Sequence, residues 1–313
     1  MTVPPNQRGA ALLTVLLLVA VMATIGTTAL DRIGLATRLT ANVSTLAQSR
    51  SWLGTAELLA VARIEDLLAL DRSQTTLAGG WMGVERSISL PDGATVRATV
   101  GDGGNCFNLN GLAERPRGRE QFVGLMTLLG IVPGEADRIA SSAADYIDSD
   151  SMPLPAGAED GSAATPPNAM MADASELRAV AGVTPRHYGM LERWVCALPV
   201  AEPAPINVNT LLPEQAPLLA MLAPGILDVS RARAQLSARP ADGYGSVLNF
   251  WNSPVLSGLD IPAQATQQVK VRSSFFTVRA TVNAGDMEVQ ESALVDARAN
   301  PARIVRRQWG EAS

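Results

Sequence analysis

Residues 10–30, AALLTVLLLVAVMATIGTTAL, form a run of 21 residues without a charged side chain. At about 1.5 Å per helical residue, such a run is about 30 Å long, which matches the hydrocarbon thickness of a lipid bilayer. The nine residues before it, MTVPPNQRG, carry Arg8 and the amino terminus but no acid. This charge bias favours a cytoplasmic N-terminus, with the rest of the chain on the far side of the membrane.

Three interpretations of this run remain open from its composition. A cleaved signal peptide would need an A-x-A-like site, for which the TTA stretch at 27–29 is the one candidate. An uncleaved signal anchor is the second. The third is cleavage between Gly9 and Ala10 by a membrane peptidase, because a glycine leaves the extended backbone unobstructed. In that case the apolar run stays in the mature protein.

The overall composition narrows the class of protein. Of the 313 residues, 47% are hydrophobic, which is enough to form a buried core. The net charge of −5 argues against a nucleic-acid-binding protein, which usually carries a basic face. The mean hydropathy of +0.13 is high for a soluble domain, and the run at 10–30 accounts for much of the excess. The single histidine, His187, and the lack of a CxxC pair argue against most histidine-dependent catalysis and zinc sites.

The remaining pattern predicts a helix and two hairpins. No proline interrupts the helical apolar spacing that continues to about residue 70, which predicts one helix of about 60 residues ending before Gly79-Gly80. Alternating segments at 86–90 and 95–100 surround one turn, and segments at 269–282 and 287–295 surround another. Because an isolated hairpin is marginal in water, we expect both hairpins in one sheet packed on the helix.

The chain between the hairpins then forms an insertion. Sixteen of the twenty prolines fall between Pro116 and Pro262, where they separate short helical segments. The predicted helices are 119–129, 134–146, 174–181, 186–196, 213–222 and 227–238. The fold class is therefore α+β, with an all-α domain inserted between strands.

Four motifs occur in order within this insertion: FNLNGL at 107–112, ADYIDSDSMPLPAGAED at 144–160, SELRAVAG at 175–182 and INVNT at 206–210. With the glycine-terminated leader and the uncharged helix, they resemble the K-type minor pseudopilin (GspK) family of bacterial type II secretion systems. The resemblance implies a pilin-like fold, a long N-terminal helix packed on an antiparallel sheet. The implied segments are a leader (1–9), the transmembrane part of the helix (10–30), the periplasmic helix and first strands (31–106), the inserted α-helical domain (107–268), and the final strands and tail (269–313).

The resemblance also assigns the N-terminal residues. Gly9 is the last residue of the leader and Ala10 the first mature residue, which the peptidase pathway methylates. Thr14 stands at the fifth mature position, where most pseudopilins carry a glutamate that pairs with the amino terminus of the subunit above. A charge in hydrocarbon is costly unless it is paired, so a subunit at the tip is better without that acid. Any membrane anchor can lack an acid, so Thr14 alone decides nothing.

The motif at 144–160 contains the clearest candidate site. Asp145, Asp148, Asp150, Glu159 and Asp160 cluster around a loop that prolines keep from being helical. A hard cation such as calcium relieves the repulsion between clustered acids, although the spacing is not that of an EF-hand. The resemblance implies calcium, with Asp148, Asp150, Glu159 and Asp160 as the metal ligands. A solvated acidic loop is the alternative.

Other residues are expected to be structural. Cys106 and Cys196 would lie in an oxidising periplasm, where a disulfide and two separately buried thiols are both possible. We expect Asn207 and Asn209 to cap backbone amides at a turn before the helix at Pro213. His187 is expected at a helix start without a catalytic role. The basic stretch 303–309 is interpreted as an edge strand, a contact surface or a solvated tail.

These observations predict a non-enzymatic minor pseudopilin at the tip of the type II secretion pseudopilus, where it initiates and caps assembly for protein export across the outer membrane. The expected partners are the I- and J-type minor pseudopilins, with the H-type as a further candidate, the major pseudopilin and the prepilin peptidase. The protein would cross the inner membrane once, with its C-terminal domain in the periplasm. The alternative is a membrane-anchored periplasmic calcium-dependent hydrolase that uses the acidic loop.

Overall fold

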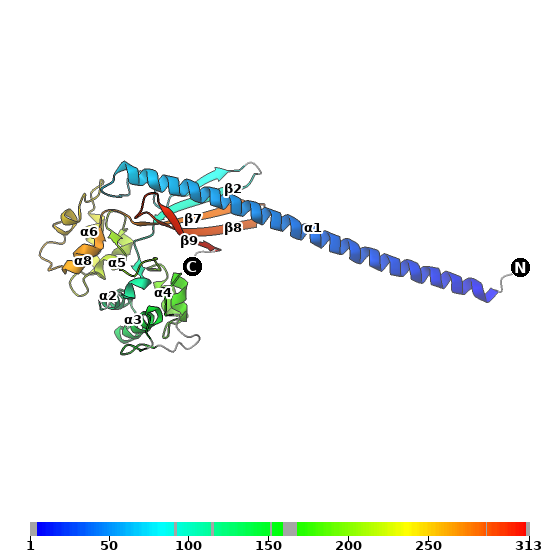
Figure 1. Ribbon diagram of the computed structural model, residues 1–313, viewed down its shortest axis with the longest axis horizontal. Helices are drawn as coiled ribbons and strands as arrows, with labels where there is room; N and C mark the ends of the chain where they lie inside the picture. The colour runs from blue at the N-terminus through cyan, green and yellow to red at the C-terminus, as the bar shows by residue number, and fades with distance from the viewer. Residues whose placement is uncertain are drawn as a thin grey trace.

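The computed structural model describes residues 5–90, 93–113, 116–150, 152–158, 168–285 and 287–310. Its first element, α1 (Pro5–Leu70), is a continuous helix of 66 residues that extends far beyond the rest of the molecule (Figure 1). The helix ends at Leu70, earlier than the expected stop at Gly79-Gly80. There the Asp71 carboxylate accepts bonds from the backbone N–H and the hydroxyl of Ser73, at 2.8 and 2.6 Å. This local turn competes with continuation of the helix.

The two halves of α1 have different surroundings. Residues 10–44 are exposed throughout, whereas the last five turns pack on the sheet. Within the part of the chain that is described, α1 is the one helix long and apolar enough to cross a membrane. Its threonine hydroxyls bond to carbonyls of the same helix, as Thr14 Oγ1 does to Ala11 O at 2.9 Å. These hydroxyls are thereby satisfied without water, which suits a lipid environment.

The sheet has five antiparallel strands in the order β1-β2-β7-β8-β9. The strands are β1 (Arg86–Ser89), β2 (Thr95–Asp102), β7 (Phe275–Ala284), β8 (Met287–Asp296) and β9 (Arg303–Trp309). Both expected hairpins are present and lie in one sheet. Pro91, Asp92 and Asp286, in the two expected turns, lie outside the described residues. The stretch 303–309, left open by the sequence, is an edge strand paired with β8.

The strand expected at 269–282 is interrupted. Val269–Lys270 forms the short strand β6, and β7 begins only at Phe275. Between them, the Ser273 hydroxyl donates to Asp102 at 2.6 Å and its backbone N–H donates to Thr75 Oγ1 at 3.3 Å. These tertiary bonds bend the chain between β6 and β7, and alternation of side chains does not reveal them.

The C-terminal half of α1 packs on one face of the sheet in two apolar clusters. Leu53 and Ala56 contact a group that includes Val96 and Val282. Further along, Ala60, Ile64 and Leu68 pack with residues of β7 and β8, among them Phe276 and Val295. The spacing of three to four residues places these side chains on one helix face. Burial of each large side chain contributes about 1.5–3 kcal/mol, so this face holds the helix to the sheet.

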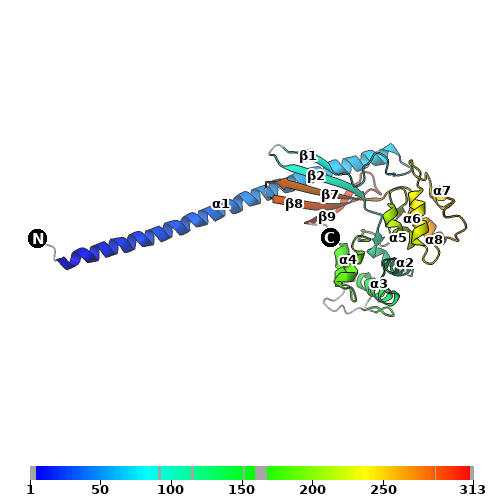
Figure 2. The same cartoon turned by 180° about the vertical axis from the view of Figure 1, so that it is seen from behind.

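In the sequence, the insertion lies between β2 and β7, which are neighbouring strands of the sheet. In space it lies beside the sheet, toward the C-terminal end of α1 (Figure 2). Its helices are α2 (Arg117–Leu128), α3 (Pro133–Ile147), α4 (Pro185–Leu191), α5 (Ala216–Ala220), α6 (Val229–Ser237), α7 (Val247–Trp251) and α8 (Ala263–Gln268). In the described part of the insertion, they are accompanied by the 3₁₀ helices η1 (Leu109–Ala113), η2 (Ala174–Ala179) and η3 (Pro213–Gln215). The expected mixed α+β architecture is confirmed.

Several details of the insertion differ from expectation. The helix predicted at 174–181 is the 3₁₀ helix η2, and the helix predicted at 186–196 ends at Leu191. The chain then forms β4 (Val195–Cys196), which pairs in parallel with β3 (Phe107–Asn108). A second short parallel pair joins β5 (Ile206–Asn207) to β6. Helices α7 and α8, of five and six residues, are too short to be recognised by periodicity.

Candidate functional site

The acidic loop begins at the C-terminal end of α3. Asp145 is fully buried in the last turn of this helix, and its carboxylate accepts the Leu154 N–H at 3.1 and 3.2 Å. Gly157 lies so close to Asp145 that a Cβ at this position would collide with the carboxylate. Asp145 therefore fastens the loop to α3.

Asp148 and Asp150 follow at the surface. Asp148 is the residue after the last turn of α3, and its Oδ1 accepts the Asp150 N–H at 3.3 Å. The Asp150 Oδ1 in turn accepts the Met152 N–H at 2.9 Å. These successive turns keep both carboxylates beside the C-terminus of a helix, where the aligned peptide dipoles favour a cation.

The other two predicted metal ligands, Glu159 and Asp160, lie outside the described residues. Among the residues that are described, no three His, Cys, Asp or Glu side chains come together as a metal-binding group. The described half of the predicted site provides hard carboxylate oxygens, the ligands that calcium prefers. Its chemistry fits that ion.

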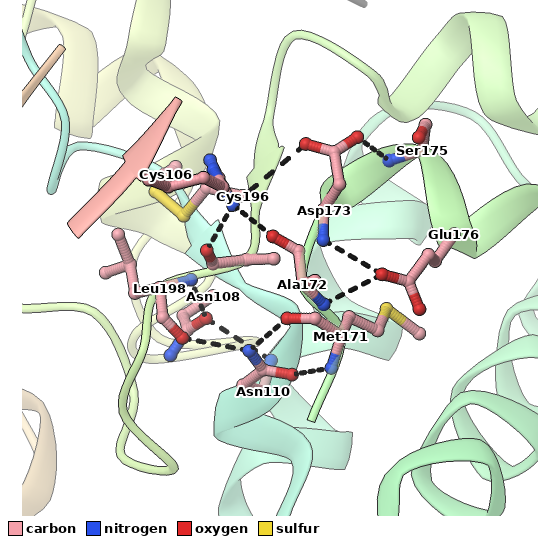
Figure 3. Close-up of polar contacts among 12 residues, drawn as sticks. Cys106, Asn108, Asn110, Met171, Ala172, Asp173, Ser175, Glu176, Cys196 and Leu198 are labelled. Atoms are coloured by element: carbon pink, nitrogen blue, oxygen red, sulfur yellow. Dashed lines mark hydrogen bonds and ion pairs between the residues drawn. A yellow bond between two sulfur atoms is a disulfide. The ribbon is translucent and has the colours of Figure 1, made fainter. Parts of the chain in front are cut away.

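The far end of the loop is held by the buried side chain of Asn110. Its Nδ2 donates to Met171 O at 3.0 Å and Leu198 O at 2.8 Å, and its Oδ1 accepts the Met171 N–H at 2.7 Å (Figure 3). The motif at 107–112 thus fixes the segment that returns from the acidic loop. The sequence revealed this motif but not its role, because Asn110 binds residues that are about 60 and 90 positions away in the chain.

The Cys106–Cys196 disulfide is present near the hydrogen bonds of Asn110, and 5.8 Å separate its two Cα atoms (Figure 3). It reinforces the β3–β4 pair, in which Asn108 lies opposite Cys196. The Asn108 Oδ1 accepts the Leu198 N–H at 2.9 Å, and its Nδ2 donates to Val200 O. The covalent and hydrogen-bonded links together join the start of the insertion to its middle.

The motif at 175–182 begins with a capping box. Glu176 Oε1 accepts the N–H groups of Ala172 and Asp173 at 2.8 and 3.0 Å, and Asp173 caps Ser175 (Figure 3). From β9, the Arg306 guanidinium donates to Ala172 O at 2.6 Å and Ala197 O at 2.8 Å. The edge strand is therefore fastened to the insertion.

The INVNT motif lies at the junction between the sheet and the insertion. Asn207 Oδ1 accepts the Asn209 N–H, and Asn209 Oδ1 accepts the Tyr244 N–H. The predicted capping of backbone amides is confirmed, although the capped amides do not belong to the helix at Pro213. Nearby, the Asp102 carboxylate accepts from Thr210 and Ser273 at 2.5 and 2.6 Å. Burial raises the pKa of Asp102, and these bonds oppose the rise.

An ionic cluster that joins two buried carboxyl groups to the half-exposed Arg307 was not predicted. Glu57 of α1 and Glu291 of β8 are each 3% exposed and lie beside the Arg307 guanidinium of β9. Arg307 Nε is 2.8 Å from Glu57 Oε2 and 3.9 Å from Glu291 Oε1. Desolvation, followed by the neighbouring Glu57, raises the pKa of Glu291 to about 8. The sequence does contain one signal of this cluster, because Glu57 follows Ala56 on the otherwise apolar face of the helix.

His187 lies near the start of α4, where it caps the backbone with Thr184. Its Nε2 is 3.7 Å from Glu135 Oε2. At the other end of the molecule, Ala10 and Thr14 lie on the exposed half of α1, and the surroundings of Gly9 fall outside what the structure describes.

The sequence and the fold match one family. Two family models described as "Type II secretion system (T2SS), protein K" match the chain, one at residues 105–200 and the other at residues 206–272. Type II secretion system protein K of Klebsiella pneumoniae is 34% identical over 97% of both chains, and that of Dickeya chrysanthemi is 32% identical over the same shares.

A solved structure is also similar, the GspK-GspI-GspJ complex of the enterotoxigenic Escherichia coli type 2 secretion system. The matching chain has 29% sequence identity and a TM-score of 0.77, covering 87% of the present chain and 99% of its own length. These similarities give no support to the hydrolase interpretation of the acidic loop.

Proposed function

Because this chain belongs to the type II secretion system protein K family and is a minor pseudopilin, we propose that it occupies the tip of the pseudopilus. There it initiates assembly and caps the growing fibre, which promotes protein export across the outer membrane. Its role is structural, and the acids of the loop bind a cation rather than catalyse a reaction.

The position of the insertion supports the tip assignment. It lies at the end of the molecule opposite the N-terminus of α1 (Figure 1). In a fibre whose subunits stack along their helices, this bulk would obstruct a further subunit above. Thr14 agrees with the same position, because a subunit with nothing above it has no amino terminus to pair with an acid in hydrocarbon.

The partners follow from the exposed half of α1. The related GspK structure is a complex with GspI and GspJ, and we propose I- and J-type pseudopilins as partners here. The H-type and the major pseudopilin would join below. On α1, Leu39 and Val43 are exposed one turn apart, and each would bury its side chain against a partner helix.

This interface is testable by co-purification of the full-length chain with I- and J-type pseudopilins. The double substitution Leu39→Glu and Val43→Glu should abolish the complex, because it places two charges in an apolar contact. Thr37→Glu with Ala41→Glu is the matched control, since it has the same spacing and charge on the opposite helix face. Equal loss in both variants, or no loss in either, would refute the proposed contact.

The N-terminus should be processed by the prepilin peptidase. We propose cleavage after Gly9, methylation of Ala10, retention of residues 10–30 in the inner membrane, and a periplasmic domain beyond them. Mass spectrometry of the purified protein should find a start at methylated Ala10. An intact Met1, or a start near residue 30, would contradict this proposal.

Calcium is proposed at the acidic loop, held by Asp148, Asp150, Glu159 and Asp160. The ion would neutralise the clustered carboxylates and stabilise the loop between its two anchors, Asp145 and Asn110. Calcium should raise the unfolding temperature of the full-length protein, and Asp148→Ala with Asp150→Ala should abolish the increase. As a control, Asp242→Ala with Asp260→Ala removes the same charge at two other exposed positions. This variant should show the same calcium-dependent increase in unfolding temperature as the unmodified protein. An equal calcium effect in all three proteins would exclude this site.

A further inference from the structure

A basic pocket of about 290 Å³ lies where the end of α1, β6 and the β8–β9 connection meet. Three cationic residues line it, namely Lys270, Arg272 and Arg298. The chain as a whole has a net charge of −5, and Lys270 is the one lysine in its sequence. The pocket therefore gathers three cationic residues on a chain whose net charge is negative.

The charges of the pocket are only partly compensated. Arg298 forms a bidentate pair with Asp296, with Nη2 2.6 Å from Oδ2, and its guanidinium lies over the Phe275 ring. Among the described residues, neither Lys270 nor Arg272 forms an ion pair, and both side chains are exposed. The nearby Asp71 carboxylate is occupied by Ser73. Two cations thus remain available at the rim.

The backbone that carries these two cations is fixed. Lys270 O accepts the Val208 N–H at 3.0 Å, and Val271 O accepts the Thr75 N–H at 2.8 Å. Ser273, buried and bonded to Asp102, holds the inner side of the same segment. Lys270 and Arg272 are both exposed and line the same pocket, on either side of the half-buried Val271. The backbone that carries the two side chains is therefore preorganised, which removes part of the entropic cost of binding.

The location and lining define the ligand. From Asp31, the first charge after the apolar run, to the end of α1 is about 60 Å at 1.5 Å per residue, so lipid headgroups of the anchoring membrane are out of reach. The lining combines cations and serine hydroxyls with the apolar side chains of Val247, Val271 and Ala297. This mixture suits carboxylates that alternate with carbon-rich side-chain stems better than it suits a small inorganic anion.

We propose that this pocket binds an acidic peptide segment of a second protein through Lys270 and Arg272, beside the Arg298–Asp296 pair. The interaction surface is separate from the exposed half of α1, and it does not depend on tip position or on the calcium site. Its strength depends on salt, because charges at an exposed rim are screened over about 10 Å at 0.1 M ionic strength.

The test uses the full-length protein in uncharged detergent micelles and a fluorescein-labelled hexaglutamate peptide, whose binding is followed by fluorescence anisotropy. Lys270→Glu with Arg272→Glu should weaken binding by about tenfold or more, because two attractive charges become repulsive. Arg186→Glu with Arg193→Glu changes the net charge equally at exposed positions outside the pocket, and it should leave the affinity within about twofold. Equal weakening in both variants, or no binding by the unmodified protein, would overturn the proposal.

The single lysine allows the bound position to be read directly. Reductive methylation with ¹³C-formaldehyde keeps the charge and labels Lys270, besides the terminal amine if it is unblocked. Hexaglutamate should shift the Lys270 methyl signal in the NMR spectrum, whereas inorganic phosphate at the same charge concentration should not. A Lys270 signal that responds to phosphate as strongly as to the peptide would show a general anion site and refute the assignment to an acidic peptide.

Discussion

Glu57 and Glu291 place two buried carboxyl groups between α1 and the sheet, beside the guanidinium of the half-exposed Arg307. Arg307 pairs closely with Glu57, so Glu291 is the group left to retain a proton. Its pKa is raised from 4.5 to about 8, chiefly by desolvation and then by Glu57, while Arg307 opposes the rise. Between these two pH values the folded state binds a proton that the unfolded state has released.

This difference predicts the sign of a pH effect. The contribution of Glu291 is fully present below about pH 4.5 and is lost as the pH rises toward 8, because folding then requires uptake of a proton. The free energy of unfolding should fall by at most about 1.4 kcal/mol per pH unit across this window. Denaturant unfolding at pH 5, 6.5 and 8 measures the slope, with pH values chosen inside the window.

Glu291→Gln should reduce this slope, since it removes the titrating proton and keeps the side-chain shape. Glu288→Gln, on the same strand but exposed, is the control and should retain the slope. A slope that is unchanged in Glu291→Gln would assign the pH dependence to other groups.

Asn110 permits a second prediction at this scale. Asn110→Ala removes both hydrogen-bonding groups of the buried amide and leaves the Met171 N–H and the Leu198 carbonyl without this partner. We expect a loss of about 2–3 kcal/mol in the free energy of unfolding. Asn42→Ala, at an exposed position of α1, should change stability by less than about 1 kcal/mol. Equal losses of stability for Asn110→Ala and Asn42→Ala in denaturant titrations would contradict the structural role of Asn110.

Helices α2 and α3 offer a matched pair of glycines, since Gly118 and Gly134 are each the second residue of their helix. A Cβ on Gly134 meets nothing within 4 Å, whereas a Cβ on Gly118 would lie 2.9 Å from the Leu112 Cα and still closer to Gly111 O. Close packing of α2 on η1 therefore requires a glycine at 118.

Opposite signs are expected for the same substitution at these two positions. Gly134→Ala should stabilise by up to about 1 kcal/mol through helix propensity. Gly118→Ala should destabilise by about 1–3 kcal/mol, because the backbone of η1 must move. The unfolding temperatures of both variants test this expectation. Stabilisation by Gly118→Ala would show that the packing of α2 on η1 can accommodate a Cβ at this position.

The disulfide acts on elements that are far apart in the chain, because it closes a loop with a separation of 90 residues. Its removal by Cys106→Ala with Cys196→Ala should lower the free energy of unfolding by about 2–5 kcal/mol. A reductant should destabilise the original protein comparably and leave the double variant unchanged. Insensitivity of the original protein to the reductant would mean that the bond contributes little.

The sequence predicted those elements whose signals are local. Helical spacing such as Leu53, Ala56 and Ala60 predicted α1, and alternation around turn residues predicted both hairpins. Contacts between remote residues were not predictable, because neither spacing nor composition records them. Glu57 and Arg307 are 250 positions apart, and Asn110 and Met171 are 61 positions apart.

The calcium site stays a prediction, and the structure describes part of its motif. Asp148 and Asp150 were found as neighbours in an acidic motif, and the structure describes them at the end of α3 as carboxylates suited to a cation. Asp145, from the same motif, is instead a buried structural residue, which only tertiary contact with Leu154 reveals. The basic pocket was missed because Lys270 and Arg272 fell within a predicted strand, and the residues that complete the lining, such as Ser73 and Arg298, come from remote segments.

For the whole molecule, α1 should show three levels of protection in hydrogen–deuterium exchange of the full chain in lipid nanodiscs. Residues 10–30 should exchange slowly in the bilayer, and 49–68 should be protected by the sheet. Residues 31–44, an exposed helical segment between them, should exchange about tenfold faster or more. Binding of I- and J-type partners should slow this middle segment. Uniform protection from 31 to 68 in the isolated protein would contradict the exposed state.

The placement of the insertion between two paired strands has a mechanical consequence. Because β2 and β7 are hydrogen-bonded directly to each other, the backbone path through the insertion is bypassed by the sheet. A pull or push along α1 is transmitted through the helix face into β2, β7 and β8, and the insertion carries little of the load. The part of the molecule that holds the acidic loop can therefore keep its shape while α1 and the sheet bear force.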